Sequence, residues 1–354
     1  MKIRNLRMSV LLNHRMWSFI RRLPVAARMS FWMLLGTGVL AAAAPWIVPD
    51  SSPDANRQDV RIRTLPPARN VYFLIDTDVQ GDSTFGYIRT PLAWYERTDA
   101  GLRYVVWDQT EDTLTAGQSQ ERRVRVEMQT FWMGTDLMGR DLLSRLLLGM
   151  RITLKIGVFA VLVSLLVGVC MGMMAGYFGG KVDQALTWLM QVVWSVPSIM
   201  LVIAFSLALG RGAWQVYLAV GLSLWVDVAR LVRGEARRLR EQEFVQAAQV
   251  LGYGPFRIMR HHLLPNMAGP ILIMAAAQFG SAILVESGLS FLGLGIQPPA
   301  PSLGMMIREH YPYILTRSAW LALAPGVVIS LMVLTCNLLS TGLSDLLGRV
   351  EKKL

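Results

Sequence analysis

The dominant pattern along this 354-residue chain is a series of long apolar segments separated by polar stretches. An α-helix needs roughly 20 predominantly apolar residues to cross a bilayer. Several of the segments contain Pro or Gly, which membrane helices tolerate when neighbouring helices satisfy the freed backbone groups. The pattern therefore predicts six transmembrane helices, at residues 31–48, 152–175, 186–209, 214–229, 267–289 and 320–343.

The first apolar segment also has features of a secretory signal, because Ala42, Ala43 and Ala44 form a sequence typical of a cleavage site. Pro45 follows directly and would obstruct cleavage. The apolar run and the polar stretch before it are both longer than in an ordinary signal peptide. We therefore expect an uncleaved membrane anchor.

Charge is scarce and unevenly placed. Only 17% of the residues are charged, against about 25% in soluble domains, and the net charge is +11. Residues 1–30 hold seven Lys or Arg and no acid, and residues 230–266 hold seven Arg against three Glu. The positive-inside rule then predicts a cytoplasmic N-terminus, a cytoplasmic loop 230–266 and a cytoplasmic tail 349–354. The basic surplus indicates orientation in an inner membrane, not nucleic-acid binding.

Residues 49–130 form the one sizeable polar insertion, which this topology places outside the cytoplasm. Alternation and β-branched residues predict short strands at Asn70–Ile75, Leu102–Trp107 and Arg122–Met128. Residues 76–82 are similar to the start of a calcium loop, but Tyr87 stands where the bidentate Glu belongs, which favours an ordinary acidic turn. The insertion is either a surface elaboration or a docking platform for an external partner.

The predicted cytoplasmic loop contains a short amphipathic helix. In it Phe244, Val245, Ala248 and Leu251 are expected close to one side, and Gly252 is typical of a helix C-cap. A short helix held between two spans would transmit force to both. The alternative is a solvated or interfacial helix, which is common in membrane proteins.

Three motifs in this order carry a family resemblance. The stretch Gln246-Ala247-Ala248-x3-Gly252, with Leu264-Pro265 after it, resembles the EAA loop of ABC importer permeases. Two further motifs, Gly134 to Arg145 and Leu289 to Gly304, are similar to those of the C-type permease subunit of the dipeptide, oligopeptide and nickel group. Gln246 departs from the usual Glu, and the 49–130 insertion is longer than such subunits usually carry.

The resemblance implies an all-α polytopic protein with the six-helix type I importer-permease fold, in which residues 131–348 form the permease core. It implies coupling to ATPase subunits through Glu243, Phe244, Gln246, Ala247, Ala248, Leu251, Gly252, Leu264 and Pro265. The other two motifs contribute Gly134, Thr135, Asp136, Gly139, Arg140, Asp141, Gly293, Gly295, Pro298, Pro299 and Pro301. The implied partners are a homologous B-type permease, two ATPase subunits, an extracytoplasmic solute-binding protein and membrane lipid.

The residues themselves offer no machinery for ATP hydrolysis or for metal binding. Residues 179–182 lack the spacing and the hydroxyl residue of a Walker A loop. His261 and His262 are adjacent, so on a helix they point about 100° apart and do not share a metal. We expect no enzymatic activity and no directly bound cofactor, with ATP and Mg²⁺ held on partner subunits.

Lys155 and Glu286 are charged residues inside predicted spans, near the outer ends of their helices. Charges in a membrane segment are functional hypotheses by default. We expect either an ion pair between them, or a snorkelling Lys155 with Glu286 lining an outer vestibule.

The sequence therefore predicts a permease subunit of an ATP-driven importer with peptides as cargo. Nickel or another small solute remains an alternative within the same importer class. An ion-coupled secondary transporter is the less favoured alternative, because its acidic residues are expected near the bilayer midplane and those of this chain lie near the span edges.

Overall fold

The computed structural model describes residues 23–76, 88–98, 101–107, 111–115, 124–210 and 212–351. The chain divides into two compact units. The helical unit comprises Met1–Ala43, Gly149–Glu309 and Ala324–Leu354, and the β unit comprises Ala44–Leu148 and His310–Leu323.

Helices dominate the described chain, and their lengths suit a membrane. Five of the described helices are long and apolar enough to span a bilayer, or six if one bent pair counts as a single span. Their apolar residues follow the predicted segments, so the all-α polytopic expectation is confirmed. The main helices are α2 (Val25–Ile47), α4 (Leu142–Phe178), α5 (Gly180–Trp194), α6 (Ser198–Leu209), α7 (Ala213–Arg240), α11 (Ala268–Phe291), α12 (Leu303–His310) and α13 (Trp320–Glu351).

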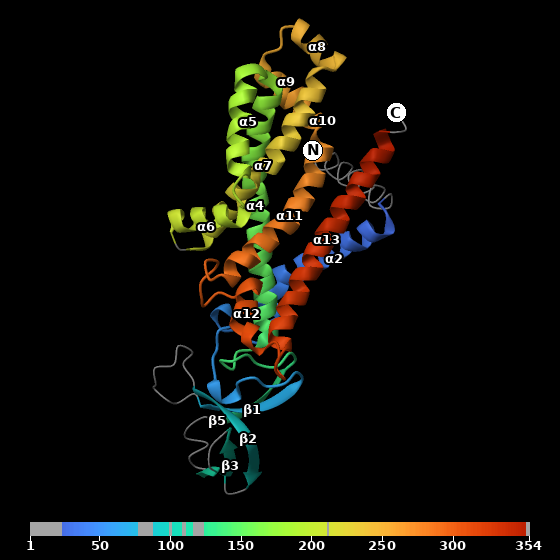
Figure 1. The fold of residues 1–354 in the computed structure, drawn as a ribbon. Helices are drawn as coiled ribbons and strands as arrows, with labels where there is room; N and C mark the ends of the chain where they lie inside the picture. The colour runs from blue at the N-terminus through green and yellow to red at the C-terminus, as the bar shows by residue number, and fades with distance from the viewer. Residues whose placement is uncertain are drawn as a thin grey trace, which may run out of the picture. The chain divides into compact units, whose positions relative to one another are not determined.

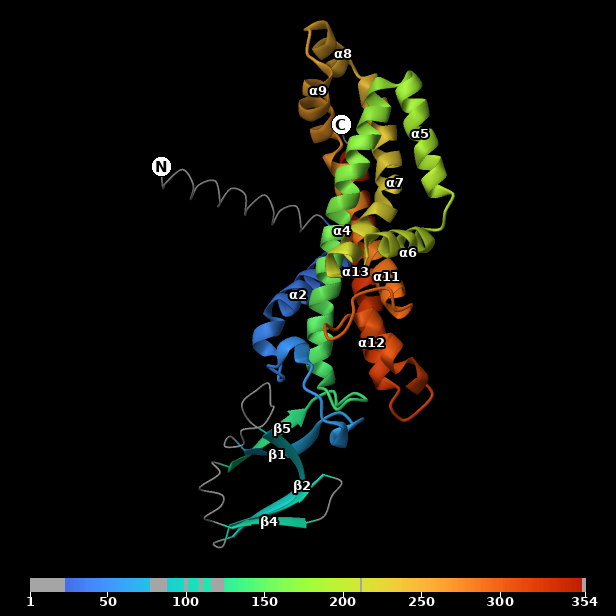
Figure 2. The ribbon, with the colours of Figure 1, turned by 90° about the vertical axis from the view of Figure 1, so that its left-hand side faces the viewer.

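The third predicted span, 186–209, is wrong as a continuous helix. The chain instead forms α5 and α6, which meet at an angle of 92° (Figures 1 and 2). Pro197 lies at the break and precedes the first residue of α6. Proline has no backbone N–H to donate and its ring clashes with the preceding turn, so the helix ends before it.

The fourth predicted span also differs, because α7 continues to Arg240 and takes up the first part of the predicted loop 230–266. Close packing against α4 supports this long helix. A Cβ placed on Gly172 of α4 would lie 2.4 Å from the carbonyl oxygen of Ala229, and one on Gly176 would lie 2.6 Å from that of Arg233. Small residues spaced by four along a helix permit such backbone approach in membranes. At these contacts the residue numbers increase in the same direction along both helices, so α4 and α7 run parallel.

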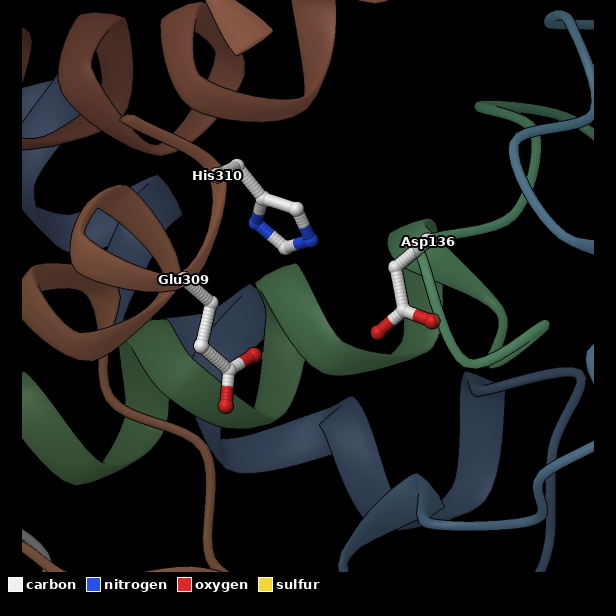
Figure 3. Close-up of side chains that lie close together, drawn as sticks. All are labelled: Asp136, Glu309 and His310. Carbon is white, nitrogen blue, oxygen red and sulfur yellow. The ribbon is translucent and has the colours of Figure 1, made fainter. Parts of the chain in front are cut away.

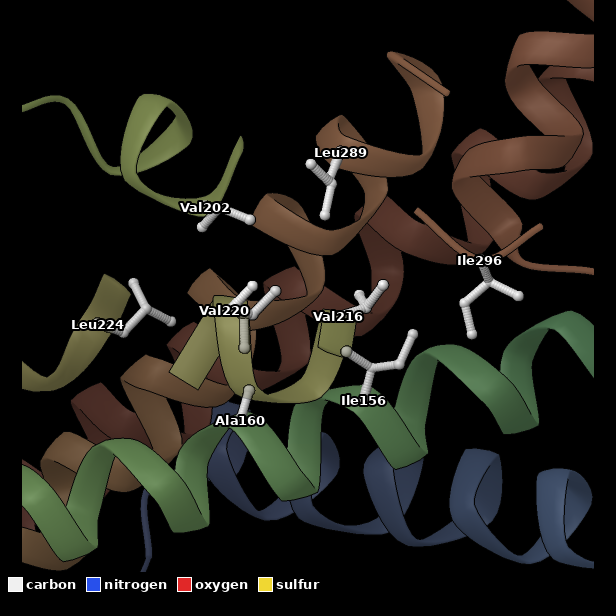
Figure 4. Close-up of a cluster of buried hydrophobic side chains, with 10 residues drawn as sticks. Ile156, Ala160, Val202, Val216, Val220, Leu224, Leu289 and Ile296 are labelled. Atoms are coloured by element: carbon white, nitrogen blue, oxygen red, sulfur yellow. The ribbon is translucent and has the colours of Figure 1, made fainter. Parts of the chain in front are cut away.

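The centre of the helical unit is an apolar cluster between α4, α6, α7 and α11 (Figure 4). The amide of Gln278 on α11 also donates a hydrogen bond to the Leu224 carbonyl of α7, at 3.1 Å. The residues of this cluster that are labelled in Figure 4 are Ile156, Ala160, Val202, Val216, Val220, Leu224, Leu289 and Ile296.

Helix α13 packs on α11 and on the start of α2. The Ser340 hydroxyl of α13 donates to the Ile273 carbonyl of α11, at 3.1 Å. A Cβ on Gly342 of α13 would lie 2.0 Å from the Ala27 Cβ of α2. The first and last described helices of the chain therefore contact one another.

The β unit contains a five-stranded antiparallel sheet in the order β4-β3-β2-β1-β5. The three predicted strands are confirmed as β1, β3 and β5, whereas β2, which contains Pro91, and β4 were not predicted. The acidic turn proposed at residues 76–82 falls almost entirely outside the described residues. The strands are β1 (Arg69–Asp76), β2 (Ile88–Thr98), β3 (Gly101–Val106), β4 (Glu111–Thr115) and β5 (Val124–Phe131).

Candidate functional site: a coupling surface and two motif loops

The predicted amphipathic helix is α8 (Glu243–Val250), and its end has the geometry that the sequence indicates. The Tyr253 N–H donates to the Ala248 carbonyl at 3.1 Å, and the Gly252 N–H donates to the Gln249 carbonyl at 2.9 Å. These two bonds form a Schellman motif, which needs a left-handed residue at Gly252, where φ is +78°. Pro255 then begins α9 (Pro255–Ile258). The chain continues through a π-helical segment, Met259–Leu263, and α10 (Leu264–Asn266).

One side of α8 is anchored in the helical unit. Val245 is fully buried and Ala248 is 3% exposed. They belong to an apolar cluster that includes Tyr177 of α4 and Val232 of α7. Val245 and Ala248 therefore attach α8 to an apolar cluster that includes residues of α4 and α7.

The prediction that four apolar residues of α8 share one side is wrong. Phe244 is 42% exposed and Leu251 is 71% exposed, while Val245 and Ala248 are buried. Successive residues of a helix are separated by about 100°, so Phe244 and Val245 diverge. The helix therefore has two apolar faces, one packed within the molecule and one exposed.

We call the exposed apolar side chains on α8 and just after it the coupling surface. It consists of Phe244, Val250, Leu251 and Phe256, of which Val250 is 88% and Phe256 71% exposed. No atom of the described residues lies within 4 Å of a Cβ placed on Gly252, so among these residues the space beside this glycine is open. Among the other predicted coupling residues, Glu243, Gln246, Ala247 and Pro265 are exposed and Leu264 is half-buried.

The Gly134–Arg145 motif folds into a loop of the β unit around a buried carboxylate. Asp136 is fully buried and accepts hydrogen bonds from the Arg140 side chain (Nε, 2.5 Å) and from its backbone N–H (2.9 Å). Arg145 Nε lies 3.8 Å from the same carboxylate. The imidazole of His310 is buried nearby, with a ring nitrogen within 4.8 Å of an Asp136 oxygen (Figure 3). These ionic contacts hold the chain in place just before α4.

The two glycines of this motif have positive φ, +77° at Gly134 and +73° at Gly139. A Cβ on Gly134 would lie 2.1 Å from the Leu65 carbonyl oxygen, and one on Gly139 would lie 1.8 Å from that of Asp59. Thr135 Oγ1 accepts a hydrogen bond from the Leu65 N–H at 2.9 Å. The motif therefore closes the polar insertion onto the start of α4, which is a structural role.

The third motif follows α11 and repeats the Schellman geometry. The Leu294 N–H donates to the Leu289 carbonyl at 3.0 Å, and Gly293 has a φ of +83°. Gly295 lies against α11, because a Cβ there would be 1.9 Å from Ser290 Oγ. Pro298 and Pro299 are exposed and Pro301 is buried. A cavity of about 350 Å³ lies beside this loop, lined by Ser206, Gly210, Gly293, Gly295, Gln297 and Arg308 among others.

The expected ion pair between Lys155 and Glu286 is not formed. Lys155 is exposed and, within the described part of the chain, makes no ion pair. Glu286 is fully buried and accepts a hydrogen bond from Ser290 Oγ at 2.7 Å and a weak one from Thr153 Oγ1 at 3.4 Å. Hydroxyl groups from α4 and α11 therefore lie beside Glu286, where the sequence predicted the cation of Lys155.

An ion pair between α5 and α7 was not predicted from the sequence. The Arg233 guanidinium donates two parallel hydrogen bonds to the Asp183 carboxylate, Nε to Oδ1 at 2.5 Å and Nη2 to Oδ2 at 2.8 Å. Arg230 lies over the ring of Trp194, 4.0 Å from its centroid. Arg230 and Arg233, which the positive-inside rule explains only as signals of membrane orientation, thus hold α5 against α7. The sequence signal for these contacts was that Arg230 and Arg233 are three residues apart and therefore lie on one face of α7.

With this geometry established, the chain can be compared with known proteins. The sequence model of the binding-protein-dependent transport system inner membrane component family matches residues 168–352. The chain belongs to this family. The matched region begins within α4 and contains the coupling surface and the loop after α11.

Curated relatives of this permease match a little over three fifths of the chain. It is 39% identical to the dipeptide transport system permease protein DppC of Bacillus subtilis (strain 168), over 61% of this chain and 68% of that protein. It is 36% identical to the oligopeptide transport system permease protein OppC of the same strain, over 63% and 72%. The glutathione transport system permease protein GsiD of Pectobacterium atrosepticum is 37% identical, over 61% and 71%.

Two solved structures are also similar to the permease. One is an inward-facing MetNI methionine ABC transporter, with 17% identity and a TM-score of 0.46, covering 56% of this chain and 94% of that chain. The other is an amino acid ABC transporter, with 17% identity and a TM-score of 0.40, covering 59% and 94%.

Proposed function

We propose that this permease is the C-type subunit of an ATP-binding-cassette importer that carries short peptides. In this proposal separate ATPase subunits bind the coupling surface from the cytoplasm. A homologous B-type permease completes the pathway, and an extracytoplasmic binding protein delivers the cargo. ATP and Mg²⁺ are held on the ATPase subunits, and both ends of the chain are cytoplasmic.

The observation that carries the proposal is the division of α8 into an anchored face and an exposed face. Val245 and Ala248 are buried against α4 and α7, while Phe244 and Leu251 are exposed. An exposed apolar patch of this kind marks a protein interaction site. A partner that binds Phe244 and Leu251 and changes shape with ATP would therefore move the long helices.

Peptide cargo is supported by the relatives and by the motif set. Proteins named as dipeptide and oligopeptide permeases match 61–63% of the chain at 36–39% identity. The matched stretch contains the complete loop from α7 to α11.

Reconstitution into vesicles tests the proposal. Purified permease is combined with the ATPase, B-type and binding-protein subunits that co-purify with it, and uptake of a labelled dipeptide and ATP hydrolysis are measured together. Gly252→Asp should abolish uptake while leaving membrane insertion intact. Asp tolerates the left-handed conformation better than most residues, and its side chain would extend into the open space beside α8.

The matched control is Trp188→Ala on α5, which also removes an exposed apolar contact, since Trp188 is 65% exposed. Its uptake should equal that of the wild type, whereas Phe244→Ala should reduce coupling of hydrolysis to uptake. Uptake that continues without ATP and without ATPase subunits, driven by a proton gradient, would instead support the secondary transporter.

A further inference from the structure

The cavity beside the loop after α11 lies wholly within the helical unit and is walled by α6, the start of α7, this loop and α12. Its volume of about 350 Å³ is at the small end of the range for ligand pockets. In the proposed orientation α11 runs outward from the cytoplasmic loop, so the cavity lies on the side from which cargo arrives. Its described lining includes Leu207, Gly212, Gly293, Leu294, Gln297 and Arg308.

Arg308 is the one charged residue among the described residues of the wall. It is exposed, and its guanidinium lies against Gly293, since a Cβ on that glycine would be 2.2 Å from Nη1. Among the described residues, no carboxylate forms an ion pair with it. The planar guanidinium therefore offers to the cavity a set of donors whose geometry matches a carboxylate.

The other polar side chains of the described wall hold the loop in place. The Ser206 hydroxyl donates to the Leu294 carbonyl at 3.3 Å, which joins α6 to the loop. The Gln297 amide donates to the carbonyl groups of Gly293 at 3.1 Å and Gly295 at 3.0 Å. Neither side chain carries a charge, so no carboxylate of the described wall opposes an anionic ligand.

The N-terminus of α7 also borders the cavity. Gly212 lines the wall and caps the helix without a side-chain hydrogen bond, and it is exposed together with Ala213 and Trp214. The first N–H groups of a helix have no partner within the helix, and the helix dipole makes this end positive. An anion in the cavity is therefore favoured both by Arg308 and by the start of α7.

We propose that this cavity binds the C-terminal carboxylate of a short peptide. The Arg308 guanidinium and the first N–H groups of α7 donate to the carboxylate, which is ionised at neutral pH. The last side chain of the peptide packs on Leu207 and Leu294. Leu207 is 66% exposed and Leu294 is half-buried, so both are open to contact. The choice of a peptide among carboxylate-bearing solutes rests on the proposed function.

Isothermal titration of the full-length permease in neutral detergent micelles tests this site. The probes are leucyl-leucine, its N-acetylated form, leucyl-leucinamide and glycerol 3-phosphate. The first two should bind with comparable affinity, because both carry the carboxylate. Leucyl-leucinamide lacks it and should bind about ten-fold more weakly or worse. Glycerol 3-phosphate represents a lipid headgroup and should bind more weakly than leucyl-leucine, because it has no apolar side chain to pack on the two leucines.

Arg308→Gln removes the charge from an exposed side chain, so the fold should be preserved. It should weaken leucyl-leucine binding about ten-fold or more, as expected for loss of charge-assisted hydrogen bonds. Lys155→Gln is the matched control, because Lys155 is an exposed cation of the same unit outside the described wall. It should bind like the wild type.

A thiol at the cavity shows where the peptide binds. Leu207→Cys is made in a Cys170→Ser background, because Cys170 is the exposed one of the two native cysteines and Cys336 is buried. The thiol is labelled with 2-sulfonatoethyl methanethiosulfonate. Saturating leucyl-leucine should slow this labelling, and the same concentration of leucyl-leucinamide should not.

The inference is overturned if the wild type does not bind leucyl-leucine, or if leucyl-leucinamide binds it as tightly. It is also overturned if Arg308→Gln binds like the wild type, if glycerol 3-phosphate binds more tightly than the peptide, or if leucyl-leucine leaves the labelling rate unchanged. These measurements need neither ATP nor partner subunits. Failure of the site therefore leaves the transport proposal standing, and failure of ATP-driven uptake leaves the binding measurement standing.

Discussion

Substitution of Gly172 by Ala tests whether the glycine stripe of α4 sets the distance to α7. The new Cβ would lie 2.4 Å from the Ala229 carbonyl oxygen and 2.9 Å from the Val232 Cβ. Ordinary contacts between such atoms are about 3.5 Å, so the two helices would have to separate by about 1 Å. Overpacking of this kind costs about 1–3 kcal/mol, whereas Ala itself favours a helix over Gly by about 1 kcal/mol in water.

The matched control is Gly234→Ala on α7, because in the part of the chain that the structure describes no atom lies within 4 Å of a Cβ at Gly234. Gly234→Ala therefore measures the effect of helix propensity on stability without a steric clash between helices. Unfolding of both variants by sodium dodecyl sulfate, starting from mild detergent micelles, gives the comparison. Gly172→Ala should be less stable than Gly234→Ala by about 1–3 kcal/mol. Equal stability of the two would show that close approach along the stripe does not hold α4 and α7 together.

Two further predictions concern the β unit. Gly139→Ala combines a positive φ of +73° with a Cβ 1.8 Å from the Asp59 carbonyl oxygen, so we expect at least about 2 kcal/mol of destabilisation, measured by thermal unfolding in detergent. Burial raises the pKa of Asp141, and the carboxylates of Asp50 and Asp136 raise it further, although hydrogen bonds from the first turn of α4 oppose this. The folded chain then holds this proton at a pH where the unfolded chain has released it. The contribution of Asp141 to stability should therefore fall as pH rises from its ordinary pKa through its raised one, and Asp141→Asn should lack this dependence in pH-resolved thermal unfolding.

The positions of α2, α4, α11 and α13 followed from the sequence because apolar length is a property of each segment by itself. The turn at Gly252 was equally readable, since only Gly adopts its conformation without strain. The bend at Pro197 was readable as a break, but its angle is set by the contacts of α6 with α7 and α11, which no local pattern encodes.

The failures at the candidate sites have a common physical cause. Glu286 and Thr153 are 133 residues apart in sequence, and their contact depends on how α4 and α11 pack. The sequence shows where charged residues lie and so suggests pairs of opposite charge. It does not show which hydroxyl groups become buried beside a carboxylate. The buried, unpaired oxygen of Asp141 likewise becomes evident only when the loops around it are placed.

The right-angle bend between α5 and α6 decides how many times the chain crosses the membrane. Since α4 and α7 run parallel, the segment that joins them must return the chain to the side where α4 began. The bent pair therefore counts as one crossing, and the total becomes six, an even number. Among the described residues, Leu23 just before α2 and Ala27 of α2 pack against Leu343 and Leu346 of α13, as expected if the first helix begins on the side where the last one ends.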